Sequence, residues 1–279
     1  MSKERKNLFL DTATQIARHW HSEPTRTEIQ GQLHGRRLYC SRYVKCQYKA
    51  TQLNSIIYLH NLLLKSEDLL QAIQKAKEWR FAEEAGGQLS PAVLPRIVDI
   101  AYWISREYKT YEEQVDALRD LIEDAWETLF HDGIELPLID ETGCIYAEGH
   151  PKMGVSEAYE PIKVSCSQKD PPECRIEEFW ENHRDEAGVL ADMDIGSIKA
   201  MPKDTRFLGE VKKCAGRVRG SPSPWGNTCT FYLSDVIVCL ESKHCREPAS
   251  VHSTNKKHFR PLCEVLGLKC EPLDQQGFG

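Results

Sequence analysis

Residues Asp235 to Lys243 read Asp-Val-Ile-Val-Cys-Leu-Glu-Ser-Lys, and this stretch decides how the carboxyl-terminal half of the chain is interpreted. Its middle is a run of apolar, mostly β-branched residues, which is typical of a strand buried on both faces. Side chains two positions apart on a strand lie on the same face. We therefore expect Glu241 and Lys243 to lie side by side where this strand ends.

The segments around this stretch predict an α/β domain over residues 173–279. The prolines and the glycine of the linker after Ser221 exclude helix there, so the runs on either side of it are expected to be extended. The elements expected, in order, are a helix over 173–186, strands over 206–219 and 228–240, a helix over 254–266 and a strand over 269–273. The two long strands would pair as a hairpin, which makes the expected sheet small and mixed.

The first part of the chain reads as helices almost throughout, which predicts a helical domain over residues 1–132. Apolar residues recur every three or four positions from Leu53 to Leu64, the spacing of one buried helical face. Thr110-Tyr-Glu-Glu113 matches a capping box at a helix start. After Gly133 the pattern alternates, which predicts a hairpin and a linker over residues 133–172. The expected fold class is α+β, a helical domain followed by an α/β domain.

A divalent metal at Glu241 needs a second carboxylate, and the expected hairpin supplies one. If its turn is centred near residue 223, Asp204 lies within one residue of the position opposite Glu241. Glu210 shares strand parity with Asp204, so it is the reserve ligand. A solvated Glu-Lys pair at the end of a strand is the alternative interpretation.

The Glu241-Ser-Lys243 triplet and this order of elements resemble the restriction-endonuclease-like, or PD-(D/E)xK, nuclease superfamily, over roughly residues 173–273. The resemblance implies that Asp204 and Glu241 bind Mg²⁺ and that Lys243 orients the attacking water. Glu177 or Glu178 on the preceding helix would add an acid. The function implied is that of a Mg²⁺-dependent DNA endonuclease of a restriction system, a hydrolase that cuts phosphodiester bonds.

A rival constellation is the spacing Cys-x5-Cys-x12-His-x4-Cys, formed by Cys239, Cys245, His258 and Cys263. Thiolates and imidazoles in sets of four are zinc ligands. A cysteine inside an apolar run is also ordinary as a buried thiol, so both interpretations stay open. The zinc reading leads to a different function, a non-catalytic nucleic-acid-binding or assembly protein with a zinc-stabilised carboxyl-terminal module.

Charge is unevenly distributed along the chain, whose formal net charge is −6. Residues 29–66 carry +6, residues 133–194 carry −10 and residues 195–270 carry +7. In the first basic segment, tyrosines alternate with the cations Arg36, Arg37, Arg42, Lys45 and Lys49, a mixture that nucleic-acid-binding surfaces use. The tyrosines are equally compatible with a core. The expected partner is double-stranded DNA, with a homodimer possible because two strands need two cuts.

The composition of the chain indicates in which cell compartment we expect the protein. The chain has 279 residues, and its apolar stretches are too short for a membrane span. Its eleven cysteines are odd in number and lack the spacing of a secreted disulfide scaffold. We therefore expect free thiols or a metal site in a reducing compartment, the cytoplasm.

Overall fold

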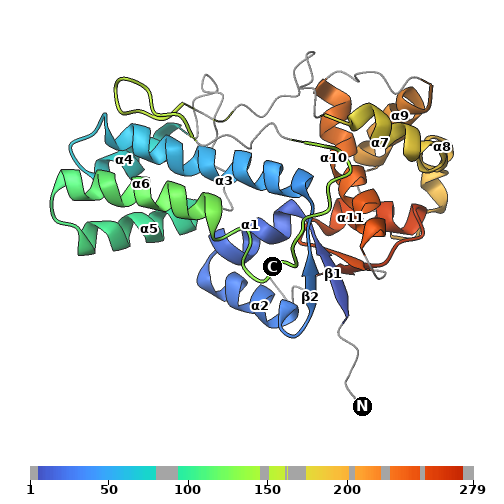
Figure 1. Ribbon diagram of the computed structural model, residues 1–279, viewed down its shortest axis with the longest axis horizontal. Helices are drawn as coiled ribbons and strands as arrows, with labels where there is room; N and C mark the ends of the chain where they lie inside the picture. Colours follow the sequence, from blue (N-terminus) through green and yellow to red (C-terminus); the bar gives the residue numbers. More distant parts are fainter. Residues whose placement is uncertain are drawn as a thin grey trace.

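The computed structural model describes residues 6–79, 94–144, 151–160, 162, 174–200, 205–220, 227–245 and 249–272. Within these ranges helices surround a small sheet, so the expected α+β class is confirmed in its coarse form (Figure 1). None of the described helices is both long and apolar enough to cross a bilayer.

The sheet joins the two ends of the chain. Its strands are β1 (Asn7–Leu10), β2 (Arg37–Tyr39), β3 (Ser250–Ser253) and β4 (Cys270–Pro272), in the order β2-β1-β3-β4 and all parallel. Phe9 of β1 stands beside Tyr39 on one side and Val251 on the other. Every residue of β1 is buried, as expected for a central parallel strand covered on both faces.

Helices α1 (Thr12–Trp20) and α2 (Glu23–Leu33) connect β1 to β2. Asp11 caps α1, because its carboxylate accepts a hydrogen bond from the backbone N–H of Thr14. At the other end of α1, the indole N–H of Trp20 donates to the Tyr48 hydroxyl at 2.8 Å. Both rings are buried, so this bond fixes α1 against α3 (Arg42–Leu63).

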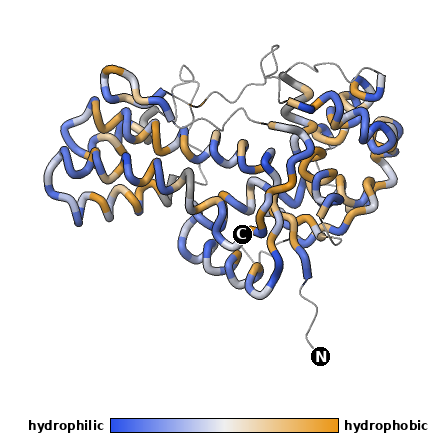
Figure 2. Tube along the Cα trace, in the orientation of Figure 1, coloured by the Kyte–Doolittle hydropathy of each residue, from blue (hydrophilic) through white to orange (hydrophobic). Residues whose placement is uncertain are grey.

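Four helices form an arm at the left of Figure 1: α3 (Arg42–Leu63), α4 (Leu69–Trp79), α5 (Leu94–Glu107) and α6 (Tyr111–Glu127). α3 packs against α4 and α6. The predicted capping box starts α6, with both of its hydrogen bonds present between Thr110 and Glu113. Hydrophobic and hydrophilic residues form separate patches along these helices, so each buries one face (Figure 2).

The remaining helices precede and follow β3. They are α7 (Ile176–Asn182), α8 (Arg184–Asp192), α9 (Arg206–Gly220), α10 (Asn227–Glu241) and α11 (Lys256–Val265), with short 3-10 turns η1 (Ile195–Ser197) and η2 (Ser242–His244). α9 packs on α8 and α10, and α10 packs on α11. The helix expected over 254–266 and the strand expected over 269–273 are confirmed as α11 and β4.

The two long strands predicted over 206–219 and 228–240 are wrong, because these segments form α9 and α10. An apolar β-branched run is compatible with a buried helix as well as with a strand, and its length of 15 residues in α10 favours the helix. In α9 the signal was present in the spacing. Its buried residues recur at helical steps and are Phe207, Leu208, Val211, Cys214, Ala215 and Val218.

Two further expectations differ from the structure. The predicted boundary near residue 132 does not separate a helical domain, because β1 and β2 belong to the same sheet as β3 and β4. The sheet is parallel and not mixed. The predicted hairpin after Gly133 is absent from the described residues, where Ile134 and Ile139 form isolated parallel bridges to Leu38 and Ser41.

One expectation about the cysteines also changes. Cys214 of α9 and Cys229 of α10 form a disulfide, with Cα atoms 5.3 Å apart. Cys40, Cys239, Cys245, Cys263 and Cys270 carry free thiols. The disulfide joins two helices that already pack together.

We predict that Tyr48→Phe lowers the free energy of unfolding by about 1–3 kcal/mol, because it leaves the buried Trp20 N–H without an acceptor. Chemical denaturation measures this. Tyr102→Phe is the matched control, since Tyr102 is 61% exposed, and it should change little. Equal effects of the two substitutions would show that the Trp20–Tyr48 bond does not stabilise the fold.

We also predict that His19 makes the protein acid-sensitive. Burial, followed by the positive charges of Arg18 and Arg26, lowers the pKa of His19 to about 3. As pH falls from 6.5 towards 3 the unfolded chain takes up a proton that the folded chain refuses, so stability falls. His19→Gln removes this loss, by up to about 1.4 kcal/mol per pH unit. Urea denaturation of both proteins between pH 7 and pH 4 measures the difference, and parallel pH curves would contradict it.

Candidate functional site

The connections between the strands run in opposite directions on the two sides of one point in the sheet, between β1 and β3. From β1 the chain goes to β2 on one side, and it later returns to β3 on the other side of β1. In parallel α/β sheets, ligands bind outside the carboxyl ends of the strands at such a switch point. Asp11 follows β1 directly, and Ser253 is the last residue of β3.

Asp11 is buried, with 2% of its surface exposed. One carboxylate oxygen accepts from the Thr14 backbone N–H at 2.7 Å and the other accepts from the Ser253 hydroxyl at 2.6 Å. The pKa of this carboxyl is raised to about 6, because burial and, to a smaller extent, the charge of Asp235 outweigh the hydrogen bonds from Ser253 and Thr14 that lower it. A bound cation would stabilise the ionised form against both unfavourable effects.

Asp235 of α10 faces the same edge of the sheet. Its carboxylate lies 2.8 Å from Nδ1 of His258, and the His258 ring stacks on Phe207 with 3.6 Å between ring centroids. The side-chain amide of Asn255, just after β3, lies 2.9 Å from the same Nδ1. The side chain of Asp235 is 22% exposed, so this carboxylate meets solvent whereas Asp11 does not.

A neighbouring contact brings α3 to this edge. The Thr12 hydroxyl donates to the side-chain carbonyl of Gln47 at 2.5 Å. Thr12 follows Asp11 in the chain, so this hydrogen bond ties α3 to the start of α1. Two carboxylates with amide and hydroxyl oxygens are ligands that suit Mg²⁺, which is commonly held by one or two carboxylates and keeps several waters.

Comparison of this chain with known protein families, with curated proteins and with solved structures finds no match. The resemblance to the PD-(D/E)xK superfamily depended on strands over 206–219 and 228–240, and the structure has helices there. The chemistry of this protein is therefore inferred from the side chains that the fold brings together.

The described residues of the predicted acid-x-Lys site lie on different elements. Glu241 ends α10 and is fully buried, and Lys243 lies in η2, paired with Glu186 of α8. Glu210, the reserve ligand, lies on α9 and pairs with Lys213. Asp204 is outside the described residues. Glu177 and Glu178 lie in the first turn of α7.

The environment of Glu241 argues against the predicted metal ligand. Burial raises the pKa of its carboxyl well above the ordinary value, and the charges of Glu141 and Asp140 add to this. Burial at this position therefore disfavours the charged form of the carboxyl, the form that binds Mg²⁺. The acid in the same stretch that reaches the sheet edge is Asp235.

The four predicted zinc ligands do not lie together either. Cys239 and Cys263 lie close together, with sulfur atoms 4.0 Å apart. His258 instead faces Asp235. Cys245 lies beyond η2, and its electrostatic influence reaches Tyr39. The four residues therefore do not form one site.

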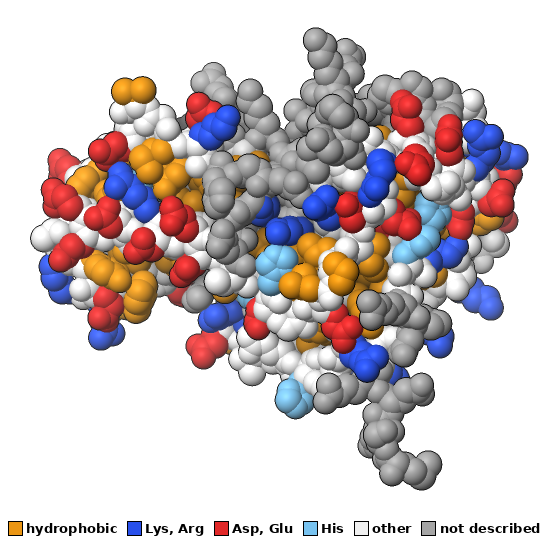
Figure 3. Space-filling model, viewed as in Figure 1, with side chains coloured by type: hydrophobic (Ala, Val, Ile, Leu, Met, Phe, Trp, Pro, Cys, Tyr) orange, Lys and Arg blue, Asp and Glu red, His pale blue; other side chains and the backbone are white. Residues whose placement is uncertain are grey.

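In the basic segment the three arginines form ion pairs, whereas Lys45 contacts a histidine and Lys49 is buried. Arg36 lies 3.6 Å from Glu271, Arg37 lies 3.7 Å from Glu135, Arg42 lies 2.9 Å from Asp140, Lys45 lies 3.0 Å from His131, and Lys49 is buried. The interleaved tyrosines Tyr39, Tyr43 and Tyr48 are core residues, which excludes them as stacking platforms. Figure 3 nevertheless shows Lys and Arg side chains gathered near the middle of one face.

The sequence pattern does not identify Asp11, because it does not predict the short strand that precedes this residue. Asn7–Leu10 is only four residues long, too short to show a period. A signal was present in Phe9-Leu10-Asp11-Thr12, an acid placed directly after an apolar run and before a helix. Asp235 lay inside the stretch that decided the sequence interpretation, but it was read as the start of a strand and not as a ligand.

We predict that Mg²⁺ or Mn²⁺ stabilises the protein through Asp11 and Asp235. At a metal concentration about 100 times the Kd, the expected gain is about 2.7 kcal/mol, seen as a higher Tm. Asp235→Asn should abolish the gain. Asp116→Asn, on α6 with 68% of the side chain exposed, is the control and should keep it. An unchanged metal response in Asp235→Asn would place the metal elsewhere.

Proposed function

We propose that this protein is a divalent-metal-dependent nuclease that hydrolyses phosphodiester bonds at the carboxyl ends of β1 and β3. The observation that carries the proposal is the buried Asp11 carboxylate at the switch point of the sheet, which senses the charge of Asp235 on α10. These two residues replace the acid-x-Lys triplet as the proposed metal ligands.

The chemistry suits this pair. Phosphodiester hydrolysis needs charge neutralised in the transition state and a nucleophilic water at neutral pH, and Mg²⁺ supplies both when bound. Asp11 is fixed by its hydrogen bonds from Ser253 and Thr14, and Asp235 is fixed by His258. Such held carboxylates keep a metal in place without reorganisation at the moment of reaction.

Nucleic acid is the substrate that the charge distribution favours. Residues 195–270, which carry Asp235 and β3, have a net charge of +7 although the whole chain has −6. Positive charge attracts the phosphate backbone regardless of sequence. Double-stranded DNA is the first substrate to test and RNA the second. Cutting both strands of a duplex would use a second copy of the chain, so a homodimer is part of the proposal.

The proposal places the protein in the cytoplasm. Cys40, Cys239, Cys245, Cys263 and Cys270 are free thiols, which is usual in a reducing compartment, although Cys214 and Cys229 form a disulfide.

The test is cleavage of linear duplex DNA, single-stranded DNA and RNA with Mg²⁺ or Mn²⁺, compared with chelator. Asp11→Asn and Asp235→Asn are each expected to lower the rate by about 100-fold or more, because each removes a metal ligand. Circular dichroism and a nucleic-acid binding assay should show that fold and binding persist. Asp116→Asn is the control.

Two outcomes would contradict the proposal. One is binding of nucleic acid without cleavage of any of these substrates, which would favour the non-catalytic alternative. The other is loss of cleavage in Glu241→Gln with full activity in Asp11→Asn, which would return the site to the acid-x-Lys triplet.

A further inference from the structure

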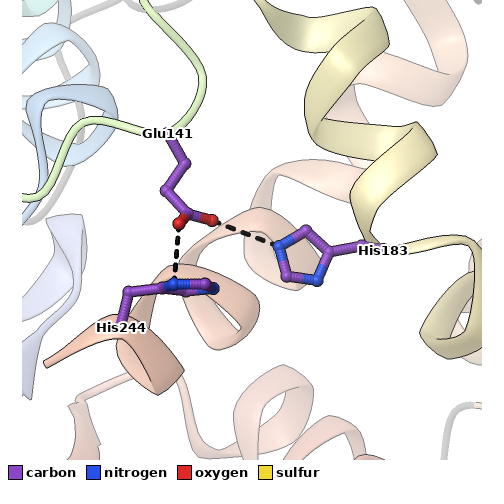
Figure 4. Close-up of side chains that lie close together, drawn as sticks. All are labelled: Glu141, His183 and His244. Atoms are coloured by element: carbon purple, nitrogen blue, oxygen red, sulfur yellow. Dashed lines mark hydrogen bonds and ion pairs between the residues drawn. The ribbon is translucent and has the colours of Figure 1, made fainter.

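A second group of chemically active side chains lies away from the proposed nuclease site. It consists of Glu141, in the segment between α6 and α7, His183, at the junction of α7 and α8, and His244 of η2. One ligand atom from each residue lies within 4.8 Å of the others. Figure 4 shows the Glu141 carboxylate between the two imidazoles, with one oxygen directed at each ring.

The distances are close to those of a metal centre. The Glu141 oxygens lie 2.7 Å from Nδ1 of His244 and 3.2 Å from Nε2 of His183. Zinc holds nitrogen and oxygen ligands at about 2.0–2.2 Å in a tetrahedron, which puts ligand atoms roughly 3.3–3.6 Å apart. The three ligand atoms lie within 4.8 Å of one another, so their separations are near those of a zinc centre.

The surroundings of His183 supply an independent reason for a cation. His183 is 5% exposed, and a carboxylate faces each of its ring nitrogens: Glu141 at Nε2, 3.2 Å away, and Glu186 at Nδ1, 3.6 Å away. Nδ1 is buried and makes no hydrogen bond within the described part of the chain, and Glu186 lies just beyond hydrogen-bond distance of it. A metal on Nε2 would leave the ring proton on Nδ1, on the side of Glu186.

This arrangement is the one that metal-binding histidines use. A ligating imidazole almost always donates its other N–H to a carboxylate or carbonyl, which fixes the ring and its tautomer. Glu186 is in turn held by Lys243, the residue before His244. Because Lys243 and His244 are neighbours in η2, this turn connects Glu186 with the proposed ligand His244.

The charges nearby leave Glu141 without a permanent cation. Asp140 pairs with Arg42 and Arg175, and Glu186 pairs with Lys243. Among the residues that the structure describes, Glu141 contacts the two imidazoles. Glu241, also near Glu141, adds acidity to the region.

We propose that Glu141, His183 and His244 bind one divalent transition-metal ion, with zinc as the preferred metal. Two imidazoles and a carboxylate suit zinc better than Mg²⁺, which takes oxygen ligands. His244 is 44% exposed, so the fourth position is open to solvent and takes a water. The ion fastens three segments that are distant in sequence, and this site is independent of Asp11 and Asp235.

The test uses metal-stripped full-length protein titrated with Co²⁺, whose visible spectrum reports coordination, and then with competing Zn²⁺. We expect one Co²⁺ per chain in a four-coordinate nitrogen and oxygen environment. His244→Ala, at a half-exposed position, should raise the Kd by at least about 100-fold, and Glu186→Gln should raise it by about 10- to 100-fold. His34→Ala, which removes an exposed histidine outside the group, is the matched control and should leave the Kd unchanged.

A gain of signal guards against misfolded variants. His244→Cys keeps a zinc ligand, so its Co²⁺ complex should acquire thiolate-to-cobalt charge transfer that the original protein lacks. Zinc should also raise the Tm of the original protein and not that of His244→Ala. The proposal is overturned if the original protein binds no Co²⁺, if His244→Ala binds it as tightly as His34→Ala does, or if the original complex already shows thiolate ligation.

Discussion

The parallel pairing of β1 with β3 is the interaction on which the rest of the structure depends. It joins residues about 240 positions apart, as in the bond between Asp11 and Ser253, whose sequence separation is 242. Closing such a long loop costs conformational entropy, although the cost rises only slowly with length. Burial of all four side chains of β1 and packing of the surrounding helices offset that cost.

The pairing of β1 with β3 also positions the side chains of the proposed metal site at the edge of the sheet. Asp11 is buried because β1 is central, and its carboxylate is held by a hydroxyl from β3 and an N–H from α1. Asp235 reaches the same edge from α10, which packs on α11 directly after β3. Burial and a second acid nearby both disfavour the ionised form of a carboxyl group. A bound metal ion would stabilise that form in both acids, which is why such a pair is a candidate metal site.

The two proposed metal centres differ in chemistry and in place. At the edge of the sheet, carboxylates with amide and hydroxyl oxygens suit a hard ion that must exchange water and contact phosphate. At the group of Glu141, His183 and His244, imidazoles favour a transition metal that stays bound. The second centre lies beside η2, directly after α10, so it supports the helix that carries Asp235.

The sequence by itself determined the long helices, because periodic apolar faces and the Thr110–Glu113 capping box depend on residues only three or four positions apart. It also determined α11 and β4. Only the tertiary structure decided that Asp235 to Glu241 is helix, since an apolar run satisfies a buried helix and a buried strand equally. It alone decided the order of the sheet and both proposed sites, because the paired strands and the side chains at these sites lie far apart in the chain.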